Sequence, residues 1–219
     1  MALFVGKGPI SGKEGDIVYA RNRYGQYTRP LRLPVNPKTE PQETVRTALA
    51  ILSQRWADLD GDERTGWKAY ADNVAIMNRV GQPIHLTAHA MFVRCNLPRL
   101  AYVEEPATRS DAPTEYSHAR LGTPQITFAG STFTLVPSPD DDWTDDGGYL
   151  FIYATPPHPP TRNFPSLPFT HIGTIAGNAQ QMTVTYPWQL ASNKCFLRLR
   201  ASAPDARLSP DLVIPFQVA

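Results

Sequence analysis

Hydrophobic and polar residues follow three different patterns along the chain. Residues 1–38 combine glycines with short β-prone runs, and residues 39–103 repeat apolar side chains at the spacing of helices. Residues 121–219 contain short apolar runs that are separated by clusters of Pro, Gly, Asn and Asp, which is typical of β-strands and turns. The order of these patterns predicts an α+β multi-domain protein.

The first region, residues 1–38, is predicted to be a β-hairpin arm. Two β-prone runs, 16–21 and 26–33, flank the turn Asn22-Arg-Tyr-Gly25. An isolated two-stranded hairpin is marginal in water, so the arm must pack on its own chain or on a neighbour. Its alternating aromatic and basic residues provide our candidate interface, which consists of Arg21, Arg23, Tyr24, Tyr27 and Arg29. Three interpretations are open: packing on the chain's own helices, an inter-subunit arm, or a nucleic-acid-binding ribbon.

The second region, residues 39–103, is predicted to be a three-helix unit. Two X-Pro steps in 36–42 keep the chain extended, and Thr39 with Gln42 has the spacing of a capping box. The second helix is expected to begin after Asp60, which pairs with Glu63 in the same way. The third is expected to run from near Thr87 to close to Pro98. The apolar residues that mark these helices are Val45, Leu49, Leu52 and Trp56 on one face of the first, Trp67, Tyr70, Ala71 and Val74 facing inward in the second, and Met91, Phe92 and Cys95 in the third.

The polar segment 104–120 is predicted to be a linker, because it contains two prolines and has no periodicity. The predicted strands after it are 125–128, 132–136, 149–154, 169–175, 182–186, 195–201 and 212–218. Seven short strands in about 100 residues are typical of an immunoglobulin-like or fibronectin type III-like β-sandwich. We therefore expect such a sandwich over 121–219.

Composition and charge change this picture only slightly. The 22 prolines favour turns and extended connections over long helices. The formal net charge of +1 conceals a division, since residues 1–103 carry +5 and residues 104–219 carry −4. Cys95 and Cys195 have no metal or redox spacing and are expected to be reduced and buried. No apolar run is long enough for a membrane span or a signal peptide, so we expect neither secretion nor membrane insertion.

No group of residues predicts an enzyme, a cofactor or a metal. His85 and His89 are four residues apart, but the pattern lacks the glutamate and third ligand of zinc proteases. The acidic run 140–146 offers oxygen ligands of the kind calcium prefers, although its spacing does not fit an EF-hand, and a solvated acidic turn is the alternative. The glycines and lysine of 8–13 do not complete a phosphate-binding loop.

The first hundred residues contain a recognisable set of motifs: a Gly-rich start, a G-x-x-V-Y hairpin that ends in Arg-Pro, the run N-P-x-T-x-x-Q-x-x-x-R, and a W-x-x-L-x-x-x-E-R-x-x-W helix pair. The matching residues are Gly15 to Tyr19, Arg29, Pro30, Asn36, Pro37, Thr39, Gln42, Arg46, Trp56, Leu59, Glu63, Arg64, Trp67, Phe92 and Asn96. With these residues the chain resembles an uncharacterised family encoded by tailed phages and bacteria. The resemblance implies a component of the virion, from the head, neck or tail.

A second resemblance covers about 35 residues of the helical region. The segment from Leu52 to Ala71 looks like the second and third helices of an HMG box, and Leu86 to Pro98 looks like the first. Because the order is permuted, a plain HMG box is excluded. The acidic turn 58–63 also leaves little of the basic surface with which that family contacts DNA.

These observations predict a virion structural protein that acts by protein–protein assembly, as a capsid decoration, minor capsid, neck or tail protein. Its expected partners are other virion proteins and further copies of itself in a homo-oligomer or symmetric assembly. One alternative is a DNA-binding accessory protein that uses the basic hairpin and the HMG-like helices. The other is an adhesion or carbohydrate-binding module that uses the C-terminal sandwich.

Overall fold

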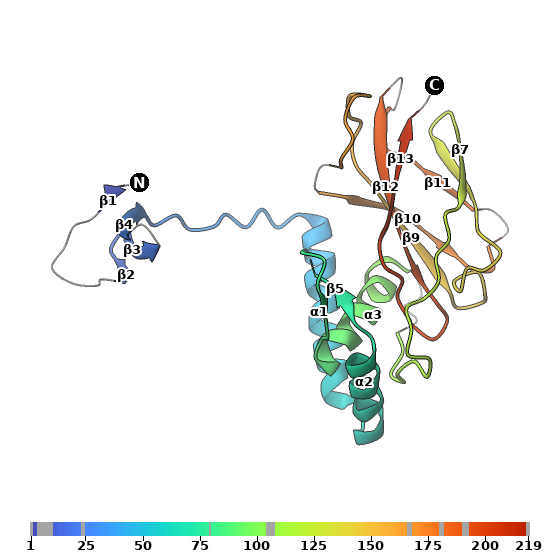
Figure 1. Ribbon diagram of the computed structural model, residues 1–219, viewed down its shortest axis with the longest axis horizontal. Helices are drawn as coiled ribbons and strands as arrows, with labels where there is room; N and C mark the ends of the chain where they lie inside the picture. The colour runs from blue at the N-terminus through green and yellow to red at the C-terminus, as the bar shows by residue number, and fades with distance from the viewer. Residues whose placement is uncertain are drawn as a thin grey trace. The chain divides into compact units, whose positions relative to one another are not determined.

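The computed structural model describes the chain in two compact units. The first, here called the arm, spans Met1–Glu40, and the second, the body, spans Pro41–Ala219. The residues described are 2–3, 11–22, 25–78, 80–103, 108–165, 168–179, 182–189 and 193–217. The protein is of the α+β class, with three helices and several antiparallel sheets among these residues (Figure 1).

The arm contains the predicted hairpin within a larger sheet. Strands β3 (Ile17–Asn22) and β4 (Gly25–Pro30) pair antiparallel from Asn22 opposite Gly25 to Ile17 opposite Pro30, which confirms the hairpin. Two further strands, β1 (Ala2–Leu3) and β2 (Gly12–Glu14), flank the hairpin and give the order β1-β4-β3-β2. Gly15, in the turn between β2 and β3, has a φ of +54°, a conformation that glycine adopts without strain.

Three helices form the first part of the body: α1 (Glu40–Asp58), α2 (Gly61–Asn73) and α3 (Ala88–Tyr102). The capping box predicted for α2 is present, because Glu63 N–H donates to Asp60 and the Glu63 carboxylate accepts from Asp60 N–H. The third helix begins next to Thr87, as expected, and the Thr87 side chain caps it by accepting from the N–H of Ala90. The helices share one hydrophobic core, whose buried side chains include Leu52, Trp67, Tyr70, Ala71, Val74, Met91, Phe92 and Cys95.

Two helical predictions need correction. Leu49 does not face the core and is 45% exposed, because the buried stripe of α1 runs through Ala48 and Leu52. The third helix does not end near Pro98 but continues for another turn to Tyr102. Proline costs helix stability by removing an N–H donor, and here burial of the last turn offsets that cost. Arg99 is fully buried there, and the Tyr102 ring packs on Tyr153 of the sheet.

A short hairpin that was not expected joins α2 to α3. Its strands are β5 (Ile76–Met77) and β6 (Pro83–Ile84). The turn between them is closed by Asn78, whose side chain accepts from the backbone N–H of Val80 and Gln82. Met77 is 71% exposed, so the hairpin contributes little to the core.

Seven strands follow in two antiparallel sheets. The three-stranded sheet has the order β11-β8-β7 and the four-stranded sheet the order β10-β9-β12-β13. Their bounds are β7 Gln125–Ala129, β8 Thr132–Val136, β9 Tyr149–Ala154, β10 Thr170–Ala176, β11 Thr183–Thr185, β12 Lys194–Ser202 and β13 Leu212–Gln217. All seven predicted strands are therefore present, with ends within two residues of the expectation. Side chains from both sheets, such as Phe133 and Leu197, share one core.

The helices and the sheets belong to the same compact body. Ala206 and Leu208, from the loop between β12 and β13, are buried in the helical core. Residues 108–120, which the sequence suggested as a linker, pack against the helices: Trp67 donates its indole N–H to Ser110 O at 2.6 Å, and Tyr70 donates its hydroxyl to Ser117 O at 3.0 Å. This segment therefore contributes to the packing of the body.

Candidate functional site

Residues 11–22 and 25–40 of the arm contain no buried side chain. Every residue of 11–22 and 25–40 is either exposed or half-buried, including the apolar residues of β3. Ile17, the most apolar residue of that strand, is 45% exposed. Because small sheets become stable by burying one face, the arm has surface to offer to another molecule.

The register of β3 and β4 separates the predicted interface residues. Residues that pair directly across an antiparallel sheet share a face, and faces alternate along each strand. Arg21 pairs with Gln26 on one face, whereas Tyr27 and Arg29 lie on the other, opposite Ala20 and Val18. Arg23 and Tyr24 lie outside the described residues. Arg21 therefore does not share a face with Tyr27 and Arg29.

The segment between the arm sheet and α1 is also exposed. Residues 31–39 have no regular secondary structure, and Leu33 and Val35 are 81% and 90% exposed. These two large apolar side chains lie on either side of Pro34. Sequence reasoning missed them as interface candidates, because it concentrated on the aromatic and basic residues of the hairpin.

The residues considered as metal ligands lie in different surroundings. His85 Nδ1 lies 3.1 Å from Ala71 O, whereas the His89 ring packs on Trp56 and its buried Nε2 has no hydrogen-bond partner among the described residues. In the acidic loop, Asp141 is buried and its carboxylate accepts from the backbone N–H of Gly122 and Ser138 and from the indole N–H of Trp143. Among the described residues, no group of three or more His, Cys, Asp or Glu side chains could hold a metal ion.

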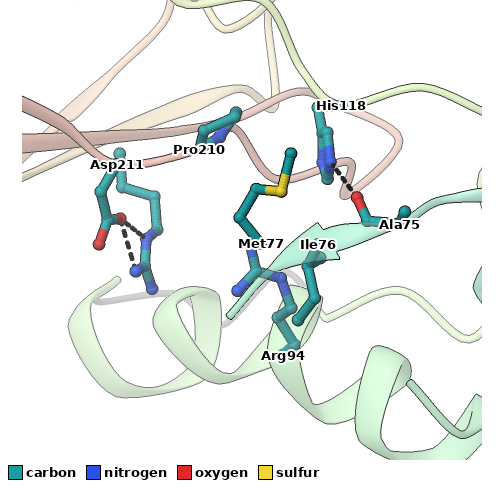
Figure 2. Close-up of a pocket in the computed structure, with 8 residues that line it drawn as sticks. Ala75, Ile76, Met77, Arg94, His118, Pro210 and Asp211 are labelled. Atoms are coloured by element: carbon teal, nitrogen blue, oxygen red, sulfur yellow. Dashed lines mark hydrogen bonds and ion pairs between the residues drawn. The ribbon is translucent and has the colours of Figure 1, made fainter. Parts of the chain in front are cut away.

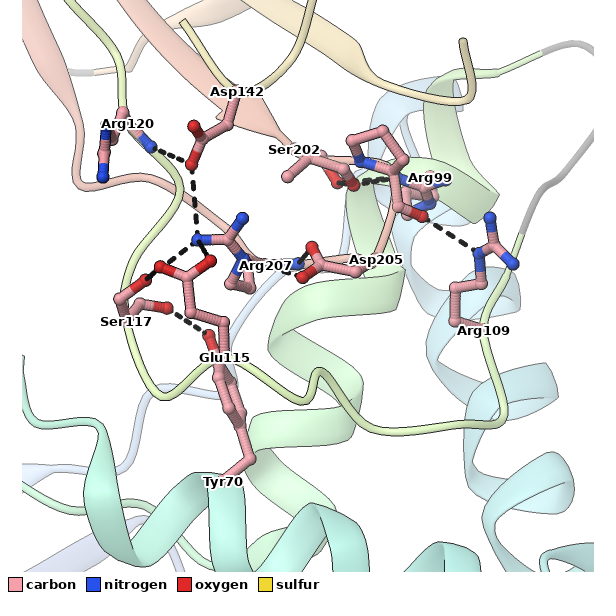
Figure 3. A network of polar contacts seen from close by, with 12 residues as sticks. Tyr70, Arg99, Arg109, Glu115, Ser117, Arg120, Asp142, Ser202, Asp205 and Arg207 are labelled. Carbon is pink, nitrogen blue, oxygen red and sulfur yellow. Dashed lines mark hydrogen bonds and ion pairs between the residues drawn. The ribbon is translucent and has the colours of Figure 1, made fainter. Parts of the chain in front are cut away.

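A polar network between the helices and the sheets is the densest cluster of charge in the body (Figure 3). The Arg207 guanidinium lies 2.7 Å from the Asp205 carboxylate, 3.0 Å from that of Glu115 and 3.3 Å from that of Asp142. These carboxylates raise the pKa of Arg207, although its burial acts in the opposite direction. Every charge in this cluster has a counter-charge, which is typical of a structural junction.

Arg99 completes this junction from α3. Its guanidinium donates to Ser202 Oγ, Ala203 O and Gly147 O at 2.8 to 3.1 Å, and it lies 4.9 Å from the ring centre of Tyr149. Burial lowers the pKa of Arg99 to about 10, so it remains charged at neutral pH. The network therefore anchors α3 to the loops of the sheets.

Comparisons with known proteins give no identification. No model of a protein family, no curated protein and no solved structure matches this chain. Within the residues described, no helix is long and apolar enough to cross a lipid bilayer.

Proposed function

We propose that this protein is a structural component of a phage virion that acts by protein–protein assembly. The observation that carries the proposal is the absence of any buried side chain among residues 11–22 and 25–40. Ordering a chain segment costs about 1–2 kcal/mol per residue in backbone entropy alone, and apolar burial is the main compensation. In the assembly, a neighbouring virion subunit or a second copy of this chain covers the arm.

The exposed apolar pair Leu33 and Val35 supports a protein partner over a nucleic acid. Side chains of this kind gain from contact with an apolar protein surface, whereas phosphate groups are bound by basic and polar donors. In this proposal Tyr27 and Arg29 form one contact face of the arm sheet and Arg21 belongs to the opposite face.

For the C-terminal part we propose a fibronectin type III-like β-sandwich. The three- and four-stranded antiparallel sheets with a shared core support this assignment. In a constant-type immunoglobulin domain the fourth strand pairs in the sheet of the first and second strands. Here the fourth strand, β10, pairs with the third, β9, which distinguishes this order from the constant type. In the particle the sandwich supplies surface coverage or display.

The proposal is tested by light scattering on the full chain at two protein and two salt concentrations, with and without duplex DNA. We expect a defined homo-oligomer that persists at high salt, because apolar contacts are not screened by ions. The double substitution Leu33→Ser/Val35→Ser should shift the mass towards the monomer. Phe164→Ser is the matched control, since Phe164 is 66% exposed and lies outside the arm.

The opposite result would be a mass that increases only with DNA and only at low salt. If Arg21→Ala and Arg29→Ala then abolished the increase while the Leu33→Ser/Val35→Ser protein behaved as wild type, the arm would be a nucleic-acid-binding ribbon. The virion-assembly role would in that case be withdrawn.

A further inference from the structure

A cavity of about 530 Å³ lies in the body beside α3. Ile76 and Met77 of β5 provide apolar lining, and Arg94 of α3, Arg200 of β12 and Asp211 provide charged groups. Figure 2 shows Arg94 rising from α3 towards Met77. Both the size and the mixture of apolar walls with a few polar groups are those of small-molecule sites.

The one carboxylate of this cavity already has two arginine partners. Asp211 Oδ1 lies 2.5 Å from Arg200 Nη2, and Asp211 Oδ2 lies 3.9 Å from Arg198 Nη1. The Arg198 guanidinium also lies 4.3 Å from the centre of the Tyr153 ring. Asp211 therefore balances a pair of guanidiniums on β12 and has little capacity left for a third.

Arg94 is that third guanidinium. It is half-buried, and among the described residues no hydrogen bond or ion pair holds its side chain. Burial is the main cause that lowers the pKa of Arg94, and repulsion from Arg200 adds to it, while Cys95 and Asp211 act in the opposite direction without reversing the shift. A guanidinium offers five N–H donors in a planar fork. The cavity therefore contains an unused fork and an uncompensated positive charge.

We propose that this pocket binds a carboxylate carried on an apolar body, with the carboxylate on the Arg94 fork and the apolar part against Ile76 and Met77. One unpaired guanidinium matches a monoanion, and the fork fits the two oxygens of a carboxylate. A dianion such as phosphate suits the site less well, because Asp211 repels the second charge. The two sources of this chemistry are a free organic acid and the C-terminal end of a polypeptide. The site does not depend on the assembly role of the arm.

The test is a titration of the full chain, labelled with ¹⁵N, in which the arginine Nε–H signals are followed by NMR. The ligands are N-acetyl-leucine, the uncharged N-acetyl-leucinamide, acetate and inorganic phosphate. We expect saturable binding of N-acetyl-leucine that moves the Arg94 signal, with weaker binding of acetate. Arg94→Gln should weaken the binding of N-acetyl-leucine at least about tenfold, because a charge-assisted pair is lost. Lys68→Gln removes one charge from the surface of α2 and should change nothing, since the Lys68 side chain is 73% exposed.

A second variant separates the two parts of the site. Met77→Ser should weaken N-acetyl-leucine and leave acetate unchanged, and it is tolerated by the fold because Met77 is largely exposed. A short peptide that ends in leucine with a free carboxylate, compared with its C-terminal amide, identifies the source. Tighter binding of the free-acid peptide than of N-acetyl-leucine indicates a polypeptide end, and exclusion of the peptide indicates a free organic acid. Equal binding of acid and amide, preference for phosphate, absence of any ligand-dependent shift, or full affinity in Arg94→Gln would each overturn the proposal.

Discussion

Replacement of Arg99 by methionine should destabilise the body by about 3 kcal/mol. The side chain is fully buried, and its guanidinium satisfies the carbonyls of Gly147 and Ala203 together with the Ser202 hydroxyl. Methionine fills much of the same space but donates no hydrogen bond. A buried acceptor left without a donor costs about 1–3 kcal/mol.

The lost hydrogen bonds of Arg99 lower the stability, whereas removal of its buried charge raises it. The Gly147 carbonyl would lose its arginine donor, which costs about 1–3 kcal/mol. Ala203 O keeps the N–H of Ala206 as a donor, and Ser202 Oγ can turn to Ala203 O, which lies 3.5 Å away, so each of these two lost hydrogen bonds costs only about 0.5–1.5 kcal/mol. Removing the charge also relieves the desolvation of a buried cation, and this gain opposes the loss of the hydrogen bonds. A net loss of about 3 kcal/mol corresponds to a decrease in Tm of about 6–12 °C for a chain of this length.

The assay is urea unfolding followed by near-UV circular dichroism. Arg99→Met should lower the midpoint with an unchanged slope, because the surface exposed on unfolding stays the same. Arg99→Lys, which keeps the charge but lacks the planar fork, should also destabilise. Arg109→Met is the control: this exposed arginine donates to Pro204 O at the same junction, and its loss should cost less than about 1 kcal/mol. A stability of Arg99→Met within 1 kcal/mol of wild type would show that desolvation cancels the hydrogen bonds.

Three further predictions concern other parts of the body. Burial lowers the pKa of His171 to about 4, so the native state binds a proton at His171 less readily than the unfolded chain does. The free energy of unfolding should therefore fall by about 1–2 kcal/mol as the pH decreases from about 6.5 towards 4. His171→Phe should remove this part of the decrease, as measured by urea unfolding at several pH values. Gly177→Ala should destabilise the protein by more than about 3 kcal/mol in thermal unfolding, because a Cβ at this position would lie 2.2 Å from a backbone oxygen. The control is Gly61→Ala in α2, where a Cβ meets no atom within 4 Å, and it should be neutral or stabilising. Cys95 and Cys195 are buried and burial raises the pKa of both thiols, so a thiol reagent should modify neither until the chain unfolds. Modification of the folded protein as fast as that of an exposed cysteine would contradict this prediction.

The elements that were predictable from the sequence are those with local causes. Asp60 and Glu63 form the cap of α2 because their spacing alone brings each side chain to the other's backbone. The strands after residue 120 could be placed because turn residues separate them and alternation marks their faces. The hairpin β3–β4 was predictable for the same reason.

What the sequence did not show depends on long-range contacts. Arg99 looks like an ordinary basic residue in the last turn of a helix, and its buried role appears only when Ser202, about a hundred positions later, lies against it. The same holds for Arg94, whose neighbours at Met77 and Asp211 come from distant segments. Polar composition suggested that 104–120 was a linker, but in 108–120 the polar groups bind the helices, as when Asn96 exchanges two hydrogen bonds with the Arg109 backbone.

The contrast between the two units determines how assembly can be separated from folding. In the body, Arg99 and Arg207 hold helices and sheets together through buried contacts within one chain. In residues 11–22 and 25–40 of the arm no side chain is buried, so changing these side chains removes little stabilising energy. Substitutions at Leu33 or Val35 should therefore shift the mass of the oligomer measured by light scattering and leave the unfolding midpoint of the body unchanged. A loss of body stability in these variants would mean that the arm folds onto its own chain, and the assembly role would lose its main support.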